Sequence, residues 1–406
     1  MQDNEKKPAL RFKGFTDPWE QRKLEEYLEV SGQKNFDGIY SKEDVLSVSG
    51  DFGIVNQIEF QGRSFAGASV ANYGVVETGD IVYTKSPLKS NPYGIIKANK
   101  GKNGIVSTLY AVYKPKQSAN PEFVQIYFEQ DARMNNYMHP LVNKGAKNDM
   151  KVSAENALKG QIVFPDIEEQ RTISEFFRNL DTLITLHQRK YEKLVNIKKS
   201  MLDKMFPQNG VSVPEIRFKG FTDPWEQRKL KELYFQLTER NADLLPYQKT
   251  LSVATMSFKT DGNGAADTSL ANYKRLRTGD IAFEGHTSKE FRYGRFVLND
   301  VGDGIMSPRF SALRPLHEMP INFWKYYIHY EPIMRKVLVN STKAGTMMNE
   351  LVINEFLQES ILVPSVAEQQ AIGRFFKQLD TLITLHQRKL EKLQNIKKSC
   401  LEKMFV

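Results

Sequence analysis

The sequence predicts a mixed α+β fold with two pseudo-symmetric domains separated by a long antiparallel two-helix coiled coil. Three observations lead to this fold class. Segments of the first half recur in the same order about 200 residues later. Two long stretches repeat apolar residues at the spacing of a helix stripe. Short β-prone runs bounded by Gly, Asn or Pro fill the rest of each half.

The duplication is clearest at the two ends of each copy. The segment RFKGFTDPWEQRKL begins at Arg11 and again at Arg217. The block from 168 to 206 matches the block from 367 to 405 at 28 of 39 positions, whereas the stretches between the shared landmarks mostly differ. The chain is therefore two copies of one plan, each a variable domain followed by a nearly identical tail.

Both tails are predicted to be long helices. No Pro or Gly interrupts the first tail between Glu169 and Phe206, which as a helix would be about 57 Å long. Such a helix is longer than a small domain needs, so we expect the two tails to pair antiparallel and cover their apolar stripes. The predicted seam residues, spaced by three or four, are Leu180, Leu183, His187, Tyr191, Leu194, Ile197, Met201 and Met205, repeated as Leu379, Leu382, His386, Leu390, Leu393, Ile396, Cys400 and Met404. For the two His residues a polar, register-setting role is favoured over a metal or catalytic one.

Turn signals and the repeat divide the chain into five parts. PQNGVSVPE, starting at Pro207, is typical of a linker. The predicted parts are a first domain at 1–166, a first long helix at 167–207, a linker at 208–215, a second domain at 216–365 and a second long helix at 366–406.

Composition limits the classes of function. The formal net charge of +9 and the pI of about 9.2 favour an acidic partner such as nucleic acid or an anionic membrane. The N-terminal MQDNEKKPAL has no apolar core of a signal peptide, and no apolar run is long enough to span a membrane. The single cysteine, Cys400, excludes a disulfide framework and fits a reducing cytoplasm.

The sequence offers only weak matches to catalytic motifs. NDVGDGIMS at Asn299 resembles a Gly-rich nucleotide loop, SNPYG at Ser90 approaches a methyltransferase motif, and PDIEEQ at Pro165 approaches a nuclease motif. The other copy keeps none of these patterns, so turns and first-turn helix acids are the favoured interpretations. We expect no catalytic residue and no metal site in this chain.

Basic loops at matching landmarks are the strongest functional signal. Lys and Arg bind phosphates, while Arg, Asn, Ser and Thr can read base edges, although solvated loops are the simple alternative for any one residue. Because the scaffold repeats while these loops diverge, the chain is predicted to read two different targets. The candidate DNA contacts are Lys85, Lys89, Asn91, Lys97, Lys100, Lys102, Lys144, Lys147 and Asn148 in the first copy, and His286, Lys289, Arg292, Arg295, Arg309, Lys343 and Thr346 in the second.

These features together resemble the specificity subunit of bacterial type I restriction-modification systems. Each half begins with Trp followed by Leu (Trp19 and Leu24; Trp225 and Leu230), passes through TGDI and ends with Pro, Glu-Gln and a long helix. The resemblance covers the whole chain. No single motif is specific to the family. The resemblance depends on the order, the spacing and the duplication of the motifs together.

The resemblance implies two target-recognition domains, each binding one half of a split site in double-stranded DNA, joined by helices that act as a spacer. It also implies two copies of a modification subunit that use S-adenosylmethionine to methylate adenine, and restriction subunits that use ATP and Mg²⁺ to translocate and cut DNA. This chain would be a non-catalytic scaffold that holds no cofactor itself.

Apolar residues in the first turns of the tails suggest where partners dock. The predicted docking residues are Phe176, Phe177, Phe375 and Phe376. Together they offer more apolar surface than one helix–helix seam can bury. The alternative is that these side chains pack under the adjacent domains.

Two other classes of function remain as alternatives. A coiled-coil scaffold without DNA reading is disfavoured by the divergent basic loops. A DNA-modifying enzyme with recognition and catalysis in one chain is disfavoured by the missing catalytic and cofactor motifs.

Overall fold

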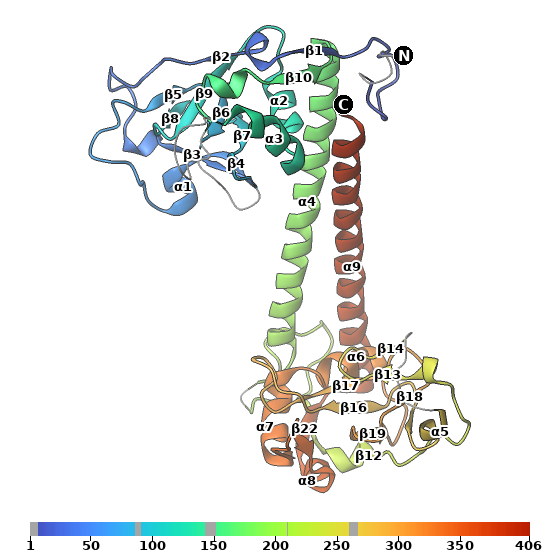
Figure 1. The fold of residues 1–406 in the computed structure, drawn as a ribbon. Helices are drawn as coiled ribbons and strands as arrows, with labels where there is room; N and C mark the ends of the chain where they lie inside the picture. The colour runs from blue at the N-terminus through green and yellow to red at the C-terminus, as the bar shows by residue number, and fades with distance from the viewer. Residues whose placement is uncertain (1–6, 86–90, 143–151, 209, 260–266) are drawn as a thin grey trace. The chain divides into compact units, whose positions relative to one another are not determined.

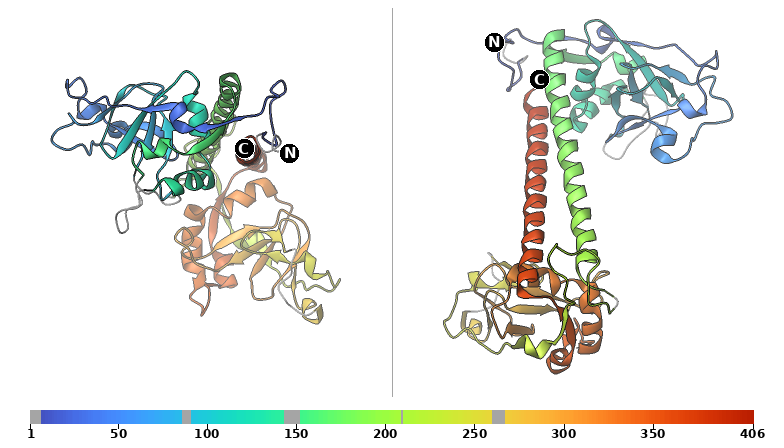
Figure 2. Two further views of the ribbon diagram at one scale, coloured as in Figure 1. Left: turned by 45° about the horizontal axis from the view of Figure 1, so that its top comes forward. Right: turned by 180° about the vertical axis from the view of Figure 1, so that it is seen from behind.

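The computed structural model divides the chain into two compact units (Figures 1 and 2). Unit 1 comprises residues 1–187 and 389–406, and unit 2 comprises residues 188–388. Each unit therefore contains one domain, the beginning of the long helix that follows it, and the end of the other long helix. The structure describes residues 7–85, 91–142, 152–208, 210–259 and 267–406.

Unit 1 is built on a four-stranded antiparallel sheet in the order β2-β9-β6-β7. Three two-stranded sheets, β1-β10, β3-β4 and β5-β8, accompany it, and α2 and α3 lie between the main sheet and the long helix α4 (Figures 1 and 2). The elements are β1 (Glu20–Lys23), β2 (Leu28–Val30), β3 (Leu46–Ser49), β4 (Gly53–Asn56), α1 (Gln57–Gln61), β5 (Gly74–Val76), β6 (Ile81–Thr84), β7 (Ile96–Ala98), β8 (Gly104–Val106), β9 (Tyr110–Pro115), α2 (Pro121–Tyr127), α3 (Asp131–Met138), β10 (Gln161–Phe164) and α4 (Ile167–Met205).

Unit 2 repeats this plan with the sheet order β12-β19-β16-β17. The register is also repeated, since Ile81 pairs with Tyr113 in one sheet and Ile281 pairs with Leu313 in the other. The elements are β11 (Glu226–Lys229), β12 (Tyr234–Gln236), β13 (Leu251–Ser252), β14 (Ser257–Phe258), α5 (Asp267–Leu270), β15 (Lys274–Leu276), β16 (Ile281–Glu284), β17 (Arg295–Leu298), β18 (Gly304–Met306), β19 (Ala312–Pro315), α6 (Ile321–Tyr327), α7 (Glu331–Ser341), β20 (Thr342–Lys343), β21 (Glu350–Leu351), α8 (Ile353–Gln358), β22 (Ser360–Val363) and α9 (Val366–Lys403).

The end of the opposite long helix closes the core of each domain. In unit 1, the ring of Phe405 lies 6.2 Å from Trp19 and 5.7 Å from Phe123. In unit 2, the ring of Phe206 lies 6.4 Å from Trp225 and 6.0 Å from Phe323. Burying one Phe side chain contributes roughly 1.5 to 3 kcal/mol to folding. Neither domain therefore completes its core with its own repeat alone.

The long helices α4 and α9 pair antiparallel within each unit. In unit 1, Phe177 of α4 lies 6.1 Å from Phe405, and one turn further along α4 Asp181 pairs with Lys397 at 2.9 Å. In unit 2, Lys198 pairs with Asp380 at 2.6 Å. The two long helices are thus present close to their predicted ranges and carry matching ion pairs.

The predicted seam is partly wrong. Leu183 and Leu382, assigned to the seam, are 45% and 43% exposed. Ile184 is half-buried in place of Leu183. Leu186 and Leu385 are also exposed, so an apolar stripe faces solvent at equivalent places on the two helices. The heptad pattern contains two adjacent apolar stripes, and the spacing alone does not say which one meets the partner helix.

A buried ion pair anchors the repeated RFKGFTDPWEQRKL segment to the first turn of each long helix. The Arg11 guanidinium donates two hydrogen bonds of 2.7 Å to the Glu169 carboxylate, whose side chain is fully buried. The Trp19 indole donates a third bond to the same carboxylate at 3.2 Å. Arg217 and Glu368 form the same two 2.7 Å bonds in unit 2. The carboxylate raises the pKa of Arg11, so the pair stays charged.

Replacing Arg11 with Met should lower the free energy of unfolding of unit 1 by about 3 kcal/mol, because it leaves the Glu169 carboxylate buried without a cation. Hydrogen exchange at β1 and β10 measures this change. Arg22→Met is the matched control, since the Arg22 side chain is 46% exposed and its ion pairs should contribute less than about 1 kcal/mol. Equal effects of the two substitutions would show that the buried pair does not anchor the segment.

Candidate nucleic-acid interface

Three loops of unit 2 that are far apart in sequence meet in space. They are the β16–β17 loop, the β18–β19 turn and the β20–β21 hairpin. The backbone N–H of Asn349 donates to the carbonyl oxygen of Gly285 at 2.9 Å, and its side-chain amide donates to the carbonyl oxygen of Arg292 at 3.3 Å. Arg309 reaches the sulfur of Met347 at 3.5 Å. The hairpin is therefore held against both other loops.

Gly285 is required where the hairpin crosses the β16–β17 loop. A Cβ atom at this position would lie 2.0 Å from the carbonyl oxygen of Asn349, which is closer than real contacts allow. The close approach leaves a pocket of about 400 Å³ beside the hairpin. Its lining residues are Phe283, Arg309, Ser311, Thr346, Met347, Met348, Asn349, Glu350 and Leu351.

Four predicted contact residues, Arg292, Arg309, Lys343 and Thr346, lie on the three loops that meet. Lys289 of the β16–β17 loop lines a separate pocket with residues of α4 and α9. Lys289, Arg292 and Arg309 are exposed, and within the described parts of the chain none of the three has a carboxylate partner. Thr346 is exposed at the hairpin. Lys343 pairs with Glu350 at 3.4 Å, and both side chains are more than half exposed. A surface pair of this kind is worth little and exchanges readily for a phosphate.

Two predicted residues of the second copy have local partners. The His286 ring lies 2.5 Å from the Glu284 carboxylate. Arg295 is half-buried, donates to the carbonyl oxygen of Ala254 at 3.2 Å and stacks 4.8 Å from the Phe291 ring centroid. Arg295 therefore supports the loop rather than presenting a guanidinium to a ligand, and its assignment as a contact residue is corrected here.

In unit 1 the structure separates the predicted residues into exposed and buried groups. Lys85 is half-buried and donates to the carbonyl oxygen of Thr108 at 3.0 Å. Lys102 is exposed, and Lys100 lies 3.9 Å from Glu122 with its side chain 45% exposed. Lys89, Lys144, Lys147 and Asn148 lie outside the described residues.

Lys97 and Asn91 are buried, so the structure does not support them as surface contacts. Each is 7% exposed, and Lys97 lies 3.8 Å from Glu129. Burial lowers the pKa of Lys97, and Glu129 partly offsets the effect. Asn91 donates to the Asp131 carboxylate at 2.8 Å. The strand that carries Lys97 packs against α2, which alternation in the sequence did not reveal.

The four Phe residues predicted to bind partners pack inside their own units. Phe177 and Phe376 are fully buried. Phe176 lies 5.6 Å from the Phe12 ring, and Phe375 lies 5.9 Å from the Phe218 ring. Burial contradicts docking for Phe177 and Phe376. Phe176 and Phe375 are half-buried, so their assignment to partner docking stays a prediction.

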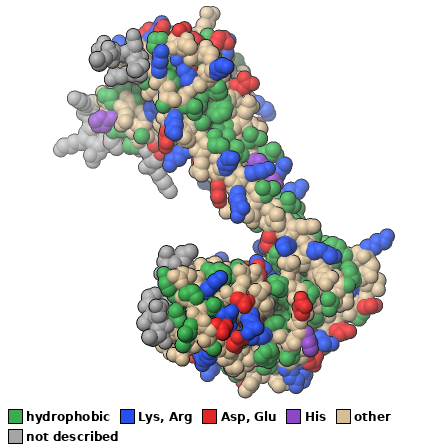
Figure 3. Space-filling view, turned by 90° about the vertical axis from the view of Figure 1, so that its right-hand side faces the viewer, with side chains coloured by type: hydrophobic (Ala, Val, Ile, Leu, Met, Phe, Trp, Pro, Cys, Tyr) green, Lys and Arg blue, Asp and Glu red, His purple; other side chains and the backbone are tan. Residues whose placement is uncertain are grey.

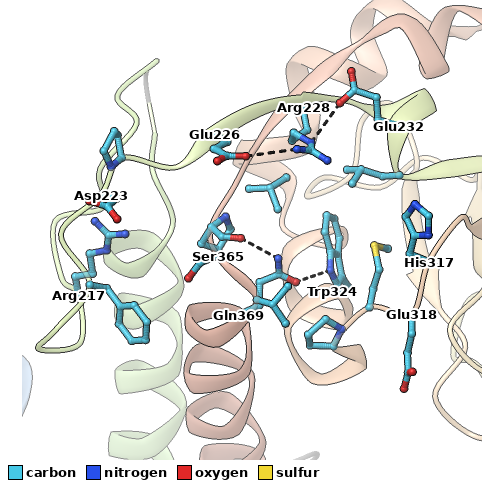
Figure 4. Close-up of a pocket in the computed structure, with 18 of the residues that line it drawn as sticks. Arg217, Asp223, Glu226, Arg228, Glu232, His317, Glu318, Trp324, Ser365 and Gln369 are labelled. Atoms are coloured by element: carbon cyan, nitrogen blue, oxygen red, sulfur yellow. Dashed lines mark hydrogen bonds and ion pairs between the residues drawn. The ribbon is translucent and has the colours of Figure 1, made fainter.

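A pocket of about 400 Å³ at the start of α9 is repeated at the start of α4 with about 300 Å³ (Figure 4). Several polar groups on its wall bond to each other. Arg228 pairs with Glu232 at 3.2 Å, and the Trp324 indole donates to Gln369 at 2.9 Å. This pocket lies between the repeated segment and the helix, and its groups stabilise that junction rather than define a ligand.

Cationic and anionic side chains are mixed on the surface shown in Figure 3. On the face displayed in Figure 3, Lys and Arg side chains are interspersed with Asp and Glu side chains rather than forming one basic patch. Among the described residues there is no group of three or more His, Cys, Asp or Glu side chains placed to hold a metal ion. No described helix is long and apolar enough to cross a membrane.

Sequence reasoning missed three residues at these surfaces. Asn349 joins the loops, Met347 is 71% exposed at the hairpin, and Leu109 is 59% exposed at the β8–β9 turn. Leu109 and Met347 are apolar and were not among the predicted basic and polar contacts. An apolar residue within a predicted turn of a divergent loop is the sequence signal for these two positions. The contacts of Asn349 depend on the fold and have no such signal.

Comparison with known proteins finds similarity over the second half of the chain and, more distantly, over most of its length. A family model described as the type I restriction modification DNA specificity domain matches residues 223–395. The chain is 21% identical to the protein assigned as the type I restriction enzyme MjaX specificity subunit of Methanocaldococcus jannaschii, covering 94% of this chain and 91% of that protein. It is 24% identical over 262 residues to the MjaVIII specificity subunit of the same organism, covering 59% of each.

A solved structure shares the fold over nearly the full length. The type I restriction-modification system S subunit from M. genitalium superposes with a TM-score of 0.57 at 12% identity, covering 98% of this chain and 99% of that chain. Residues 223–395 therefore carry a type I restriction modification DNA specificity domain. Over 94% of its length the chain is similar to a type I restriction enzyme specificity subunit.

Single Ala substitutions at Lys289 and Arg292 should weaken binding to duplex DNA by about 1 kcal/mol each and make the salt dependence of binding shallower. Fluorescence anisotropy over a series of salt concentrations measures both quantities. Arg228→Ala is the control, because Arg228 is similarly charged but lies on β11, away from the three loops. A loss shared equally by all three variants would indicate general electrostatics instead of this surface.

Proposed function

We propose that this chain is a non-catalytic subunit that recognises a bipartite, asymmetric site in double-stranded DNA, with each domain reading one half-site. The observation that carries the proposal is the meeting of three divergent loops of unit 2, which present Lys289, Arg292 and Arg309 without carboxylate partners in the described chain. Exposed cations and polar hairpin residues suit phosphate and base-edge contacts. The divergent copies would read different sequences.

We further propose that α4 and α9 hold the two domains at a fixed spacing. Both helices are continuous over 39 and 38 residues, and each unit contains the beginning of one helix and the end of the other. Two equivalent ion pairs between the helices, Asp181 with Lys397 and Asp380 with Lys198, would fix the register of α4 against α9.

The helices also offer two equivalent surfaces to partner subunits. Leu183 and Leu186 in unit 1, and Leu382 and Leu385 in unit 2, are 43% to 45% exposed and stand at equivalent positions. Two matching apolar surfaces suit two copies of one modification subunit. Restriction subunits would complete the complex.

In this proposal the partner subunits carry all the chemistry. Modification subunits would use S-adenosylmethionine to methylate adenine, and restriction subunits would use ATP and Mg²⁺ to translocate and cleave DNA in the bacterial cytoplasm. A scaffold that does not read DNA is the alternative, and the salt-dependence measurement above separates it from the proposal. The other alternative is an enzyme that both reads and modifies DNA. In that case the purified chain alone would turn over S-adenosylmethionine.

Exchanging residues 213–364 for the matching region of a relative should change one half of the methylated sequence and leave the other half unchanged. The exchange replaces the second domain but keeps both long helices. Sequencing methylated adenines in cells that express the variant with its modification subunit gives the result. A change in both halves would contradict independent reading by the two domains.

Inserting four residues after His187 and four after Arg388 should widen the unread gap by one or two base pairs. These positions are the boundaries of the two units, so contacts within each unit are kept. Four residues add about 6 Å and exceed one helical turn only slightly, while base pairs rise about 3.4 Å each. Methylated-site mapping should show unchanged half-sites.

Inserting two residues at the same positions serves as the control for helical phase. Two residues rotate the following helix by about 200°. This variant should lose methylation activity because the apolar stripes no longer meet. An unchanged gap with full activity in the four-residue variant would mean that the helices do not set the spacing.

A further inference from the structure

The β8–β9 turn of unit 1 and the β18–β19 turn of unit 2 place residues 109 and 309 at equivalent positions. Both turns follow a strand of Gly and two apolar residues and close with a backbone hydrogen bond. Tyr110 donates to Ser107 at 3.0 Å, and Phe310 donates to Ser307 at 3.2 Å. The strands on either side of the turn pair in the same register in both units. Val106 pairs with Gly74 as Met306 pairs with Lys274. Tyr113 pairs with Ile81 as Leu313 pairs with Ile281.

The two positions differ in chemistry but share their exposure. Leu109 is 59% exposed. Arg309 is exposed, and its guanidinium donates a hydrogen bond to the Met347 sulfur at 3.5 Å. Neither side chain contributes to the core of its domain.

The surroundings of each position can bind nucleic acid. Beside Leu109, the Lys85 ammonium donates to the carbonyl oxygen of Thr108 at 3.0 Å, which places a cation next to the exposed leucine. Beside Arg309 lies the hairpin pocket, where Thr346 and Asn349 supply polar groups. The acid in that pocket, Glu350, is paired with Lys343 at 3.4 Å.

We propose that residues 109 and 309 are matched base-reading positions of the two domains, with Arg309 reading a guanine and Leu109 a thymine methyl group. The inference rests on the proposed function and adds a residue and a base to each half-site. A guanidinium can donate two parallel hydrogen bonds to O6 and N7 of guanine in the major groove. An apolar side chain at the same place has no donor and gains by covering the 5-methyl group of thymine.

The same turn therefore reads a different base in each domain because one side chain differs. The Arg309 guanidinium would distinguish guanine from other bases by hydrogen bonding, because a wrong base leaves its N–H donors unpaired. Leu109 discriminates by apolar contact, which is weaker and tolerates more substitutions. We expect base preference at the Arg309 position to exceed that at the Leu109 position.

Selection of bound duplexes from a randomised pool by the full-length chain tests the assignment. Arg309→Leu should reduce the preference for guanine at one position of one half-site by roughly tenfold or more, leaving every other position unchanged. Leu109→Arg should raise guanine preference at one position of the other half-site. Arg228→Leu is the control, since Arg228 is 46% exposed on β11 and paired with Glu232 at 3.2 Å.

The outcomes separate the inference from the function on which it rests. If the wild-type chain selects no sequence, the proposed function fails and the inference fails with it. If the wild type selects a bipartite sequence and Arg309→Leu selects the same one, only the inference is overturned. A uniform loss of affinity for all sequences, with a shallower salt dependence, would assign Arg309 to a phosphate. Thermal melting of each variant shows that altered selection does not come from unfolding.

Discussion

The burial of one phenylalanine at the end of each long helix is the contact on which the rest of the architecture depends. Phe405 packs against Trp19 and Phe123 in unit 1, and Phe206 packs against Trp225 and Phe323 in unit 2. Each domain thus obtains part of its core from the other repeat. The helices can neither slide nor separate without exposing these rings, so stability of the domains and register of the helices are one property.

This dependence explains why some segments repeat and others diverge. The segment from Arg11 to Leu24 contributes a buried Trp and the Arg partner of Glu169, and the same residues from Arg217 do so in unit 2. These positions are constrained by packing. The loops around Arg309 and Leu109 contribute few side chains to the hydrophobic core. Substitutions there therefore change the surface without changing the fold.

Much of the architecture followed from the sequence, because duplication and apolar periodicity are local signals. The helix bounds came out close to prediction, since Pro165 and Pro364 stop the preceding strands and Asp166 and Ser365 accept hydrogen bonds from the first turns. Which apolar stripe of the helix is covered was not predictable. Leu183 and Ile184 are both apolar, and only the path of the partner helix decides between them.

The candidate site was harder to predict because it depends on contacts distant in sequence. Burial of Lys97 follows from the packing of β7 on α2 and from its pairing with Glu129. The importance of Asn349 follows from a backbone bond to Gly285 across 64 positions of sequence. Residue types in loops do not reveal burial, so the three-dimensional structure was needed to separate a half-buried arginine such as Arg295 from an exposed one such as Arg309.

The junction between helix end and domain start has the same geometry whether or not the chain is continuous there. In unit 2 the backbone N–H of Ile216 donates to Lys204 at 2.9 Å, and a short linker joins the two. In unit 1 the N–H of Leu10 donates to Lys403 at 2.8 Å, although the two residues lie 393 positions apart in the sequence. The joint between a long helix and the start of a domain is therefore formed by the repeated residues themselves. It does not need the short covalent linker that is present in unit 2.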